Sequence, residues 1–550
     1  MIRTTLILLF AMTPVMAWAG PYDAPASYYN TATGTGSTLK TQLNDIIDGH
    51  TVVSYDSART ALQVTDADPN NPGHILLVYN RVSLDVSVIN PGGPIPGWDA
   101  GLSWNREHTW ADSRGLGGSG PDYPDLHHLR PSTPSVNGSR GNLNFGGAYG
   151  QPYGSVNDGG TFWYPGDADA GLIARSEFYM ATRYDGADAN TIDLELQPGN
   201  PTTAQGLGNL NRMVEWHYQA VPDDFELRRN DVIYDTYQNN RNPFVDHPEF
   251  VWSVFKDQMN DSQLYVGAAP AADGSSSTSV DFGQVLVGAS TPGPQNVTLH
   301  RNGNDGSYFE VSTAGDATSN INGRLNAFAI NNTGSDSKTL TVGLNTTTAT
   351  AGLKSGTVTI DNLDITTQGG AGVGANDDID VVNLALTVLD HAEPSFDGLL
   401  ALDSLVHDFG AITQGAPMPT FNFDIFNLEA TDMLTVGLDF DSLFGSGHTS
   451  ILSTDLATFG GASALAAGSS NGYLATFNTS IPGTFSATYT LDFSDKDLPG
   501  AMQLGGLTLT LMGSIVAVPE PSTVGLAAIG LVLCALARRR HGARRQDCRS

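Results

Sequence analysis

The sequence predicts a multidomain protein in which an α+β domain is followed by two all-β sandwich domains. The chain has 550 residues, which is too long for a single domain of ordinary size. Its first half mixes helical and strand-like hydrophobic patterns, whereas its second half contains short strand-like runs separated by Gly, Asn, Asp and Ser. We therefore expect the α+β domain at 20–262, a polar linker at 263–278, and sandwiches at 279–391 and 392–517.

Charge and cysteine content exclude two classes of protein. The chain has 26 Lys and Arg against 57 Asp and Glu, a formal net charge of -31. This net charge excludes a protein whose whole surface binds nucleic acid, but it is compatible with a local basic cleft. The segment 263–521 is the poorest in cations, with 5 Lys and Arg against 26 Asp and Glu. The two cysteines, Cys534 and Cys548, lie at the C-terminal end, so the rest of the chain has no disulfide scaffold.

The N-terminal segment 1–19 has the three parts of a secretory signal peptide. Arg3 supplies the positive charge, 6–16 is largely apolar, and Ala17-Trp18-Ala19 is a small-residue cleavage site. We expect export through the Sec pathway, with a mature protein that begins at Gly20. The alternative is a buried N-terminal helix.

The C-terminal segment 518–550 also has three parts: a Pro-Glu-Pro motif at 519–521, an apolar run at 524–537 and arginines at 538–540. The run is shorter than the about 20 residues of a full membrane span. The order of these parts resembles the PEP-CTERM sorting signal of bacterial surface proteins. The resemblance implies transient membrane association and removal of the tail by an exosortase-type enzyme. The alternative is a plain C-terminal membrane anchor.

An internal repeat supports two similar sandwiches. Asp281-Phe282-Gly283 and Asp408-Phe409-Gly410 are each followed by a glycine five residues later and then by a strand-like alternation, at 296–300 and 421–426. The predicted modules resemble the immunoglobulin-like modules of bacterial surface proteins. They contain no cluster of His, Cys or paired acids with the spacing of a site, which favours a spacer or adhesive role, with matrix polysaccharide as a candidate partner.

Residues 104–145 contain the groups most suited to chemistry. His108 is an imidazole that can accept a proton near neutral pH. Glu107 and Asn137 offer oxygen ligands for a hard cation. Four arginines match the geometry of phosphate: Arg106, Arg114, Arg130 and Arg140. A base, a hard cation and guanidinium groups are the components of metal-assisted phosphodiester hydrolysis.

The local pattern predicts a compact frame for these groups. We expect a strand from Gly101 that ends at Glu107-His108, and a second extended run at 126–130. Thr133 followed by Pro134 is the start of a helix, which would carry Asn137 and Arg140. A strand, a loop, a strand and a helix would thus surround one cation.

Three motifs resemble the bacterial endonuclease I family of secreted or periplasmic nucleases, which belongs to the ββα-metal, or His-Me finger, superfamily. They are Asn-Arg-Glu-His at 105–108, Asp-Leu-His-His-Leu-Arg-Pro at 125–131 and Ser-Val-Asn-Gly-Ser-Arg-Gly-Asn at 135–142. Further segments at 174–184, 216–217 and 239–248 fit the same family, so the resemblance covers about residues 75–255.

The resemblance implies a role for each motif residue. His108 would be the general base that activates water, and Glu107 and Asn137 would hold Mg²⁺, with Mn²⁺ or Ca²⁺ as alternatives. By position, Arg114 is the candidate for the arginine that stabilises phosphate. From the residues alone, Arg130 and Arg140 would either bind phosphate or pair with Asp112 and Asp125. The family is similar to enzymes that cut DNA and RNA with little sequence preference.

Two further histidine positions are expected to be structural. His127 and His128 are neighbours on an extended run and point to opposite faces, so they do not suit one metal ion. Trp216-His217 lies in an apolar-periodic stretch and is expected in the core. The sequence thus predicts an exported, metal-dependent endonuclease that acts on DNA or RNA. The alternative is a surface or biofilm-matrix protein that uses a catalytically weak nuclease domain for binding.

Overall fold

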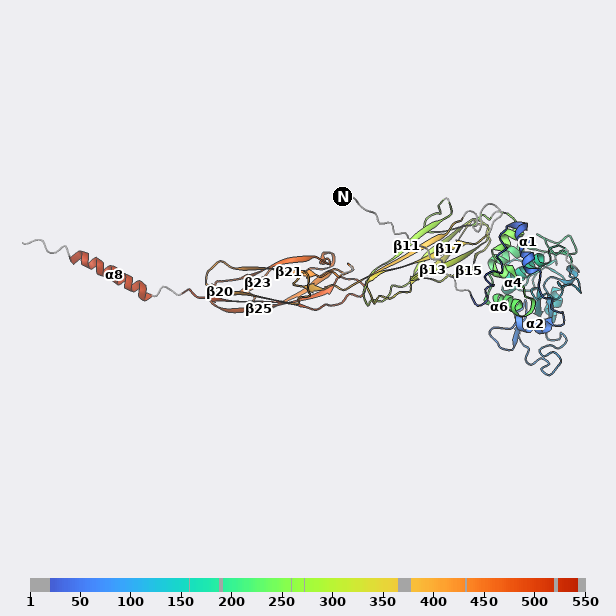
Figure 1. Ribbon diagram of the computed structural model, residues 1–550, viewed down its shortest axis with the longest axis horizontal. Coiled ribbons are helices and arrows are strands. Elements are labelled where there is room, and N and C mark those ends of the chain that lie inside the picture. The colour runs from blue at the N-terminus through green and yellow to red at the C-terminus, as the bar shows by residue number, and fades with distance from the viewer. Residues whose placement is uncertain are drawn as a thin grey trace, which may run out of the picture. The chain divides into compact units, whose positions relative to one another are not determined.

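The computed structural model describes residues 20–542 except 158, 187–190, 259, 272, 365–376, 431–432 and 519–522. The predicted signal peptide and the Pro-Glu-Pro motif lie outside the described residues. A mixed region of helices and short strands is followed by a large all-β region (Figure 1), as the sequence predicts. Contacts divide the chain into two compact units: Met1–Val280 with Gly293–Asn345 and Ser355–Leu384, and Asp281–Pro292 with Thr346–Lys354 and Ala385–Ser550.

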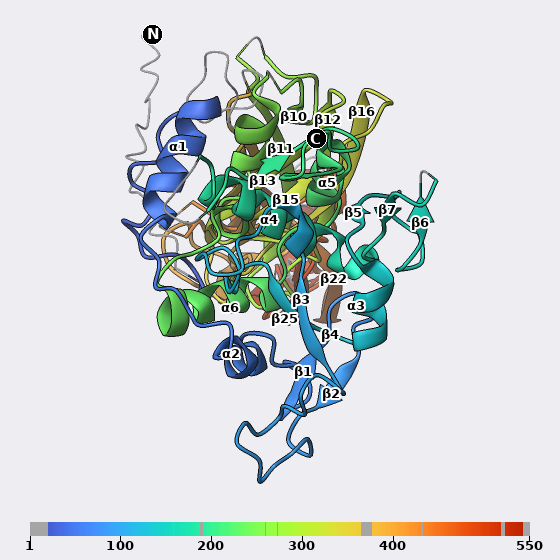
Figure 2. The same ribbon diagram turned by 90° about the vertical axis from the view of Figure 1, so that its right-hand side faces the viewer.

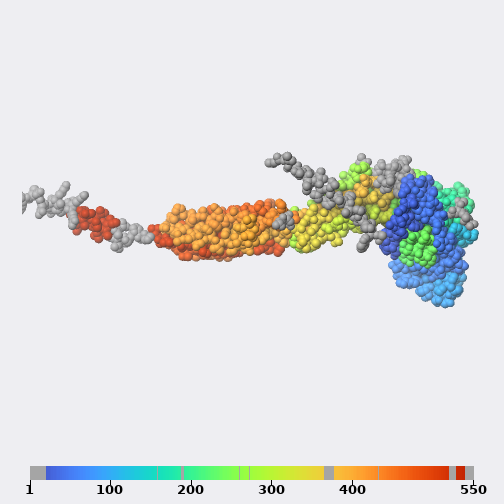
Figure 3. Space-filling model, in the orientation of Figure 1, coloured from blue at the N-terminus to red at the C-terminus, as the bar shows by residue number. Residues whose placement is uncertain are grey.

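Helix α4 is the centre of the mixed region. Apart from its first two residues it is buried, and its aromatic and aliphatic side chains share one core with α1 and α5. The segment that contains α1 and α2, coloured blue, forms part of the surface of this region (Figure 3). The helices are α1 (Gly36–Ile47), α2 (Ala58–Thr65), α3 (Pro134–Arg140), α4 (Asp167–Arg183), α5 (Leu210–Gln219), α6 (Asp224–Val232) and α7 (Pro243–Asp246).

The strands of the mixed region are short and form small sheets. The pairs are β1–β2, β3–β4 and β8–β9, and β7 lies between β5 and β6. The bounds are β1 (His74–Leu76), β2 (Ser83–Asp85), β3 (Asn105–His108), β4 (Leu129–Ser132), β5 (Asn144–Phe145), β6 (Val156–Asn157), β7 (Phe162–Trp163), β8 (Glu195–Leu196) and β9 (Gly206–Leu207).

The frame predicted around His108 is present, with shorter strands than expected. Strand β3 pairs antiparallel with β4 and α3 follows β4 directly (Figure 2). The expected strand start at Gly101 was wrong, because the Asp99 carboxylate accepts the backbone N–H groups of Leu102 and Ser103 and holds a turn there. The expected start at Leu126 was wrong for a similar reason: the carbonyl and side chain of Asp125 hold 126–129 in a turn.

The first pair of β-sheets has the orders β10-β12-β16-β14 and β11-β18-β17-β13-β15. Strand β10 lies inside the predicted linker 263–278, where it pairs with β12 and buries Leu264 and Val266. The bounds are β10 (Gln263–Val266), β11 (Ser276–Leu286), β12 (Gln295–Asn302), β13 (Ser307–Gly315), β14 (Ala317–Ser319), β15 (Gly323–Phe328), β16 (Ser335–Leu344), β17 (Gly352–Asn362) and β18 (Asp380–Leu389).

The second pair of sheets has the orders β19-β21-β24-β23 and β20-β26-β25-β22. Side chains from both sheets, such as Ile425 and Leu509, share one core. The bounds are β19 (Pro394–Ser395), β20 (Ser404–Thr413), β21 (Thr420–Asn427), β22 (Leu438–Gly447), β23 (Leu452–Thr454), β24 (Ser470–Phe477), β25 (Gly483–Asp495) and β26 (Leu507–Val516).

The predicted internal repeat is confirmed by matching local structure. Gly283 and Gly410 both adopt a positive φ, 83° and 71°, a conformation that glycine tolerates best. In each copy the aspartate two residues earlier accepts the backbone N–H of that glycine at 2.8 Å. The Asp-Phe-Gly pattern is therefore a backbone turn built into a strand, and not a catalytic motif.

The apolar run near the C-terminus forms α8 (Thr523–Gly542). Among the described residues, no helix combines the length and the hydropathy needed to cross a membrane. Cys534 on this helix is exposed and unpaired.

The mixed region and the first pair of sheets share a buried junction. The Tyr308 hydroxyl on β13 donates to the carbonyl of His217 on α5 at 2.7 Å. Asp364, which is fully buried, accepts the side-chain N–H of Asn260 at 2.9 Å. Arg324 on β15 pairs with Glu249 and donates to the carbonyl of Asp246. These contacts make the mixed region continuous with the adjoining end of the first sheets.

Candidate active site

Glu107 is a buried carboxylate between β3 and α3. Its side chain is 2% exposed, and its Oε1 accepts hydrogen bonds from the Tyr79 hydroxyl at 2.8 Å and from the Arg140 guanidinium at 3.2 Å. Burial raises the pKa of Glu107 to about 7, and Arg140 and Tyr79 oppose this rise. None of the described residues donates to Oε2, so this oxygen is available to a ligand.

Asn137 lies on α3, one turn before Arg140. Its side-chain NH₂ group donates to the Oδ1 of Asn105 at 3.0 Å and to the carbonyl of Arg106 at 3.4 Å. This leaves the Oδ1 of Asn137 as the atom that can act as a ligand. Asn105, Glu107 and Asn137 therefore present oxygen atoms on the side of β3 that faces α3.

His108 is held by a backbone carbonyl. Its Nε2 lies 3.1 Å from the carbonyl oxygen of Tyr123. A carbonyl only accepts, so Nε2 carries the proton and Nδ1 is the acceptor in the neutral ring. Burial, together with repulsion from His128, lowers the pKa of His108 to about 3, although the hydrogen bond to the Tyr123 carbonyl opposes this shift. No described residue forms a hydrogen bond with Nδ1, which is free for a substrate or water.

The arginines of the motifs do not share one environment. Arg140 is 1% exposed and donates to Glu107 and to the carbonyls of His108 and Thr109. Arg130 is equally buried and pairs with Asp66 at 2.6 Å. Arg114 is half-buried and donates to the carbonyls of Asn142 and Gly206 at 3.3 and 3.5 Å. Arg140 thus positions Glu107 from the interior instead of facing solvent.

The two neighbouring histidines lie in the interior, in the structural role expected for them. His127 Nε2 bonds the carbonyl of Asn240 at 3.3 Å, and His128 Nε2 bonds the carbonyl of Asp122 at 2.9 Å. Burial lowers the pKa of both to about 4. They share a network around buried Asp125, whose carboxylate accepts hydrogen bonds from Tyr179, Tyr184 and Gln238.

Trp216 and His217 also lie in the core, as the periodicity of α5 predicts. Both are fully buried. The indole N–H of Trp216 donates to the carbonyl of Gly147 at 3.2 Å, and His217 Nε2 bonds the carbonyl of Pro248 at 2.9 Å. Neither side chain is available for chemistry.

Sequence reasoning missed three residues near Glu107 and His108. Tyr79 donates to Glu107, and the ring of Tyr55 stacks on His108 with an interplanar angle of 19°. Glu177 on α4 is fully buried, and none of the described residues donates to its carboxylate with good geometry. Burial raises the pKa of Glu177 to about 8, while the nearby Thr109 side chain and Arg140 oppose the rise. Tyr55 and Tyr79 lie outside the three motifs, and Glu177 lies in the segment 174–184, where nothing in the sequence indicated its burial near Arg140.

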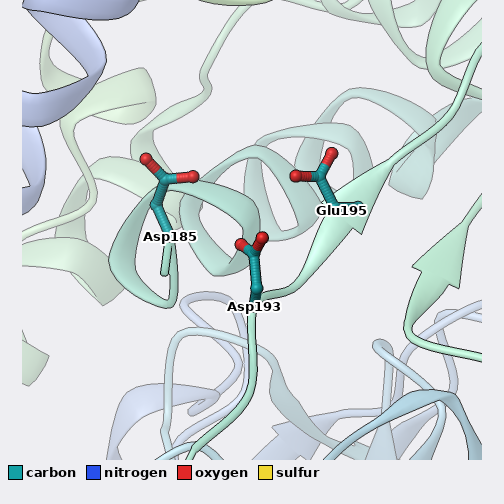
Figure 4. A group of neighbouring side chains, drawn as sticks. All are labelled: Asp185, Asp193 and Glu195. Atoms are coloured by element: carbon teal, nitrogen blue, oxygen red, sulfur yellow. The ribbon is translucent and has the colours of Figure 1, made fainter. Parts of the chain in front are cut away.

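An exposed acidic group lies elsewhere in the mixed region. The side chains of Asp185, Asp193 and Glu195 converge within 4.8 Å of one another (Figure 4). Lys40 pairs with Asp185 at 2.6 Å and neutralises part of this charge. The group does not include Glu107 or Asn137, so it is distinct from the ligands predicted from the motifs.

The mixed region and the C-terminal segment are each similar to known protein families. The family model described as Endonuclease I matches residues 35–249, and the PEP-CTERM protein-sorting motif matches residues 517–540. An extracellular ribonuclease of Bacillus subtilis (strain 168) is 42% identical over 254 residues, which is 84% of its length and 44% of this chain. An extracellular ribonuclease of Bacillus amyloliquefaciens is 43% identical over 239 residues, which is 78% of its length and 42% of this chain. The chain therefore belongs to the endonuclease I family and ends in a PEP-CTERM sorting motif.

Proposed function

We propose that the protein is an exported, metal-dependent endonuclease that hydrolyses phosphodiester bonds of DNA and RNA with little sequence preference. Membership of the endonuclease I family and the two extracellular ribonucleases support a secreted nuclease. The observation that carries the catalytic proposal is the pair of adjacent residues on β3: Glu107 with a free oxygen and His108 with a free ring nitrogen.

His108 acts as the general base through Nδ1. Because Nε2 donates to the Tyr123 carbonyl, the ring is held in one tautomer and one orientation. Its low pKa keeps the ring neutral, and therefore able to accept a proton, at neutral pH. The negative charge of a bound phosphodiester would raise this pKa and so make the imidazole a stronger base.

Glu107 and Asn137 fit a hard divalent cation: Mg²⁺, with Mn²⁺ or Ca²⁺ as alternatives. Both offer oxygen atoms only, which favours these ions over Zn²⁺. Burial raises the pKa of Glu107 although Arg140 opposes the rise, and a bound cation would further favour the charged carboxylate. When bound, the cation would stabilise negative charge on the phosphate and on the leaving oxygen.

The β3–β4–α3 arrangement supports assignment to the ββα-metal, or His-Me finger, type of nuclease. In this assignment the antiparallel pair presents His108 and Glu107, and the helix presents Asn137. Arg140 holds Glu107 in place, and Tyr79 fixes the same oxygen from the other side. Arg114 remains a candidate for contact with phosphate if its hydrogen bonds to carbonyls exchange on binding.

The remaining regions serve export and display. We assign the two pairs of sheets to immunoglobulin-like modules that hold the nuclease at the cell surface or bind matrix polysaccharide. The sorting motif supports processing by an exosortase-type enzyme after export through the Sec pathway. Helix α8 would associate with the membrane transiently until the tail is removed.

A plasmid-nicking assay on the purified protein tests this proposal. We expect nicking and then linearisation of supercoiled plasmid with Mg²⁺, loss of both in excess EDTA, and recovery when Mg²⁺ is restored. The His108→Ala variant, prepared identically, controls for contaminating nucleases. Full activity in EDTA contradicts the metal site, and absence of cleavage with every divalent ion favours a protein that only binds nucleic acid.

A further inference from the structure

The side of β3 that faces away from α3 carries Arg106 beside His108. Residues two apart on a strand point to the same face, about 7 Å apart along it. The guanidinium of Arg106 lies 3.5 Å from the ring centroid of Tyr55 and 5.5 Å from that of Trp98. The same Tyr55 ring stacks on the imidazole of His108, with centroids 5.5 Å apart. One aromatic ring thus positions both side chains.

Arg106 is the motif arginine that combines partial exposure with a single hydrogen bond to the described residues. Arg130 and Arg140 are buried in ion pairs, and Arg114 is bonded to carbonyls. Arg106 is only half-buried and gives one N–H to the carbonyl of Tyr55. Among the residues that the structure describes, no carboxylate forms an ion pair with it.

We propose that Arg106 is a substrate-binding residue that contacts a phosphate of the strand being cut, and that Tyr55 and Trp98 hold its guanidinium for this contact. The inference rests on the proposed nuclease function and goes beyond it by naming a residue that binds a substrate phosphate. A guanidinium stacked on a ring keeps its N–H edge free, and this edge matches two oxygen atoms of a phosphate. Its neighbour His108 then faces the same strand.

The stack also explains why arginine and not lysine suits this position. The planar guanidinium can lie flat on Tyr55 while it donates from its edge, whereas an ammonium group cannot do both. A cation on an aromatic face is further stabilised by the ring, most of all when it is partly removed from water. The charge is therefore held in place before the substrate arrives, which reduces the entropy lost on binding.

Binding is measured in the His108→Ala background, so that the probe is not cut. The probe is a fluorescein-labelled single-stranded 20-nucleotide DNA in Ca²⁺ buffer over a series of salt concentrations. We expect Arg106→Gln to weaken binding about tenfold and to reduce the slope of log affinity against log salt by about 0.7, the value for one lost phosphate contact. Arg106→Lys should keep the slope and lose part of the affinity.

Arg212→Gln is the matched control, because it removes the charge of a half-exposed arginine on α5 that pairs with Glu215.

Tyr55→Leu should weaken binding in the presence of Arg106 and have no further effect in the Arg106→Gln variant, whereas Tyr55→Phe should keep full affinity. Circular dichroism confirms that each variant is folded. The proposal is overturned if Arg106→Gln loses no more affinity than Arg212→Gln, or if its salt slope equals that of the parent. Cleavage by the wild-type protein is assayed separately, so failure of the nuclease function and failure of this contact give different results.

Discussion

The two faces of strand β3 differ in burial and in partners. The face toward α3 carries Asn105 and Glu107 and is closed by Tyr79, Asn137 and Arg140. The opposite face carries Arg106 and His108, which both stack on the ring of Tyr55. Alternation along four residues thus separates a closed face, where the Glu107 carboxylate is buried, from a more open face, where Arg106 and His108 are half-buried. The roles proposed for the first face depend on balanced charge, and those proposed for the second depend on partial access to solvent.

The largest expected effect is on the open face. His108→Ala should lower the cleavage rate about 10²–10⁴-fold, the usual contribution of a positioned base. The melting temperature should fall only modestly, because the ring gives up one hydrogen bond to the Tyr123 carbonyl, worth about 1 kcal/mol, and its stack on Tyr55. Initial rates and thermal melts measured on the same preparation check this. Near-normal turnover in the pure variant would exclude His108 as the base.

On the closed face, Arg140→Met should act mainly on stability. Removal of the guanidinium leaves Glu107 and Glu177 buried without a cation, and breaking a buried ion pair costs about 3–5 kcal/mol of unfolding free energy. Denaturant unfolding followed by fluorescence measures the loss. A stable variant with weakened DNA binding would instead make Arg140 a phosphate ligand and remove the distinction between the faces.

Glu107 gives the closed face a pH dependence that a metal ion should cancel. Its folded pKa, about 7, lies above the ordinary value of 4.5. The group therefore stabilises the metal-free fold at low pH, and this contribution of at most about 3 kcal/mol is lost as the pH rises through 7. Melts of the EDTA-treated protein from pH 5 to 8 should show this loss, and Mg²⁺ should restore stability at pH 8.

The Glu107→Gln variant is the control for that series, because its side chain does not titrate. Its melting temperature should lack this pH dependence and should not respond to Mg²⁺. If the variant is stabilised by Mg²⁺ as strongly as the parent, the cation binds elsewhere, and the exposed group of Asp185, Asp193 and Glu195 becomes the site to examine.

The smallest effect should come from Asn105, whose side chain bonds the proposed metal ligand Asn137. Asn105→Ala removes the acceptor for the Asn137 amide, a hydrogen bond worth about 1 kcal/mol. We expect an increase of a fewfold in the Mg²⁺ concentration needed for half-maximal rate, with the maximal rate nearly unchanged. A large drop in the maximal rate at saturating Mg²⁺ would show that Asn105 acts on the substrate itself.

The sequence predicted the helices and strands around the candidate site better than it predicted which side chains contact one another. Pro134 after Thr133 marked the start of α3, and the strand-like alternation marked β12 and β21, because these signals are local. The linker at 263–278 was less well predicted, since composition alone does not reveal that Leu264 and Val266 extend a sheet. A strand as short as β10 can be identified only from its pairing with β12, which the local sequence does not show.

The roles of the arginines could not be predicted from spacing. Arg106, Arg130 and Arg140 all occur in dense polar motifs, yet their environments depend on Tyr55, Asp66 and Glu107. Tyr55 and Asp66 lie far from their arginines in the sequence. Glu107 is adjacent to Arg106 but lies on the opposite face of β3. Three-dimensional contacts therefore separate the arginine that we propose to bind substrate from those that support the core.

The buried junction between the mixed region and the first sheets limits how the mixed region can be separated from the rest of the chain. Tyr308, Asp364 and Arg324 bond to groups from 217–260, and β10 continues the chain straight into the sheet. A fragment that is moved into another protein would therefore have to include this edge of the sheets, although composition alone suggests a domain boundary at residue 262. A protease that nicks the chain at 267–275 would leave the two pieces associated, so the enzyme could be cut there without being set free.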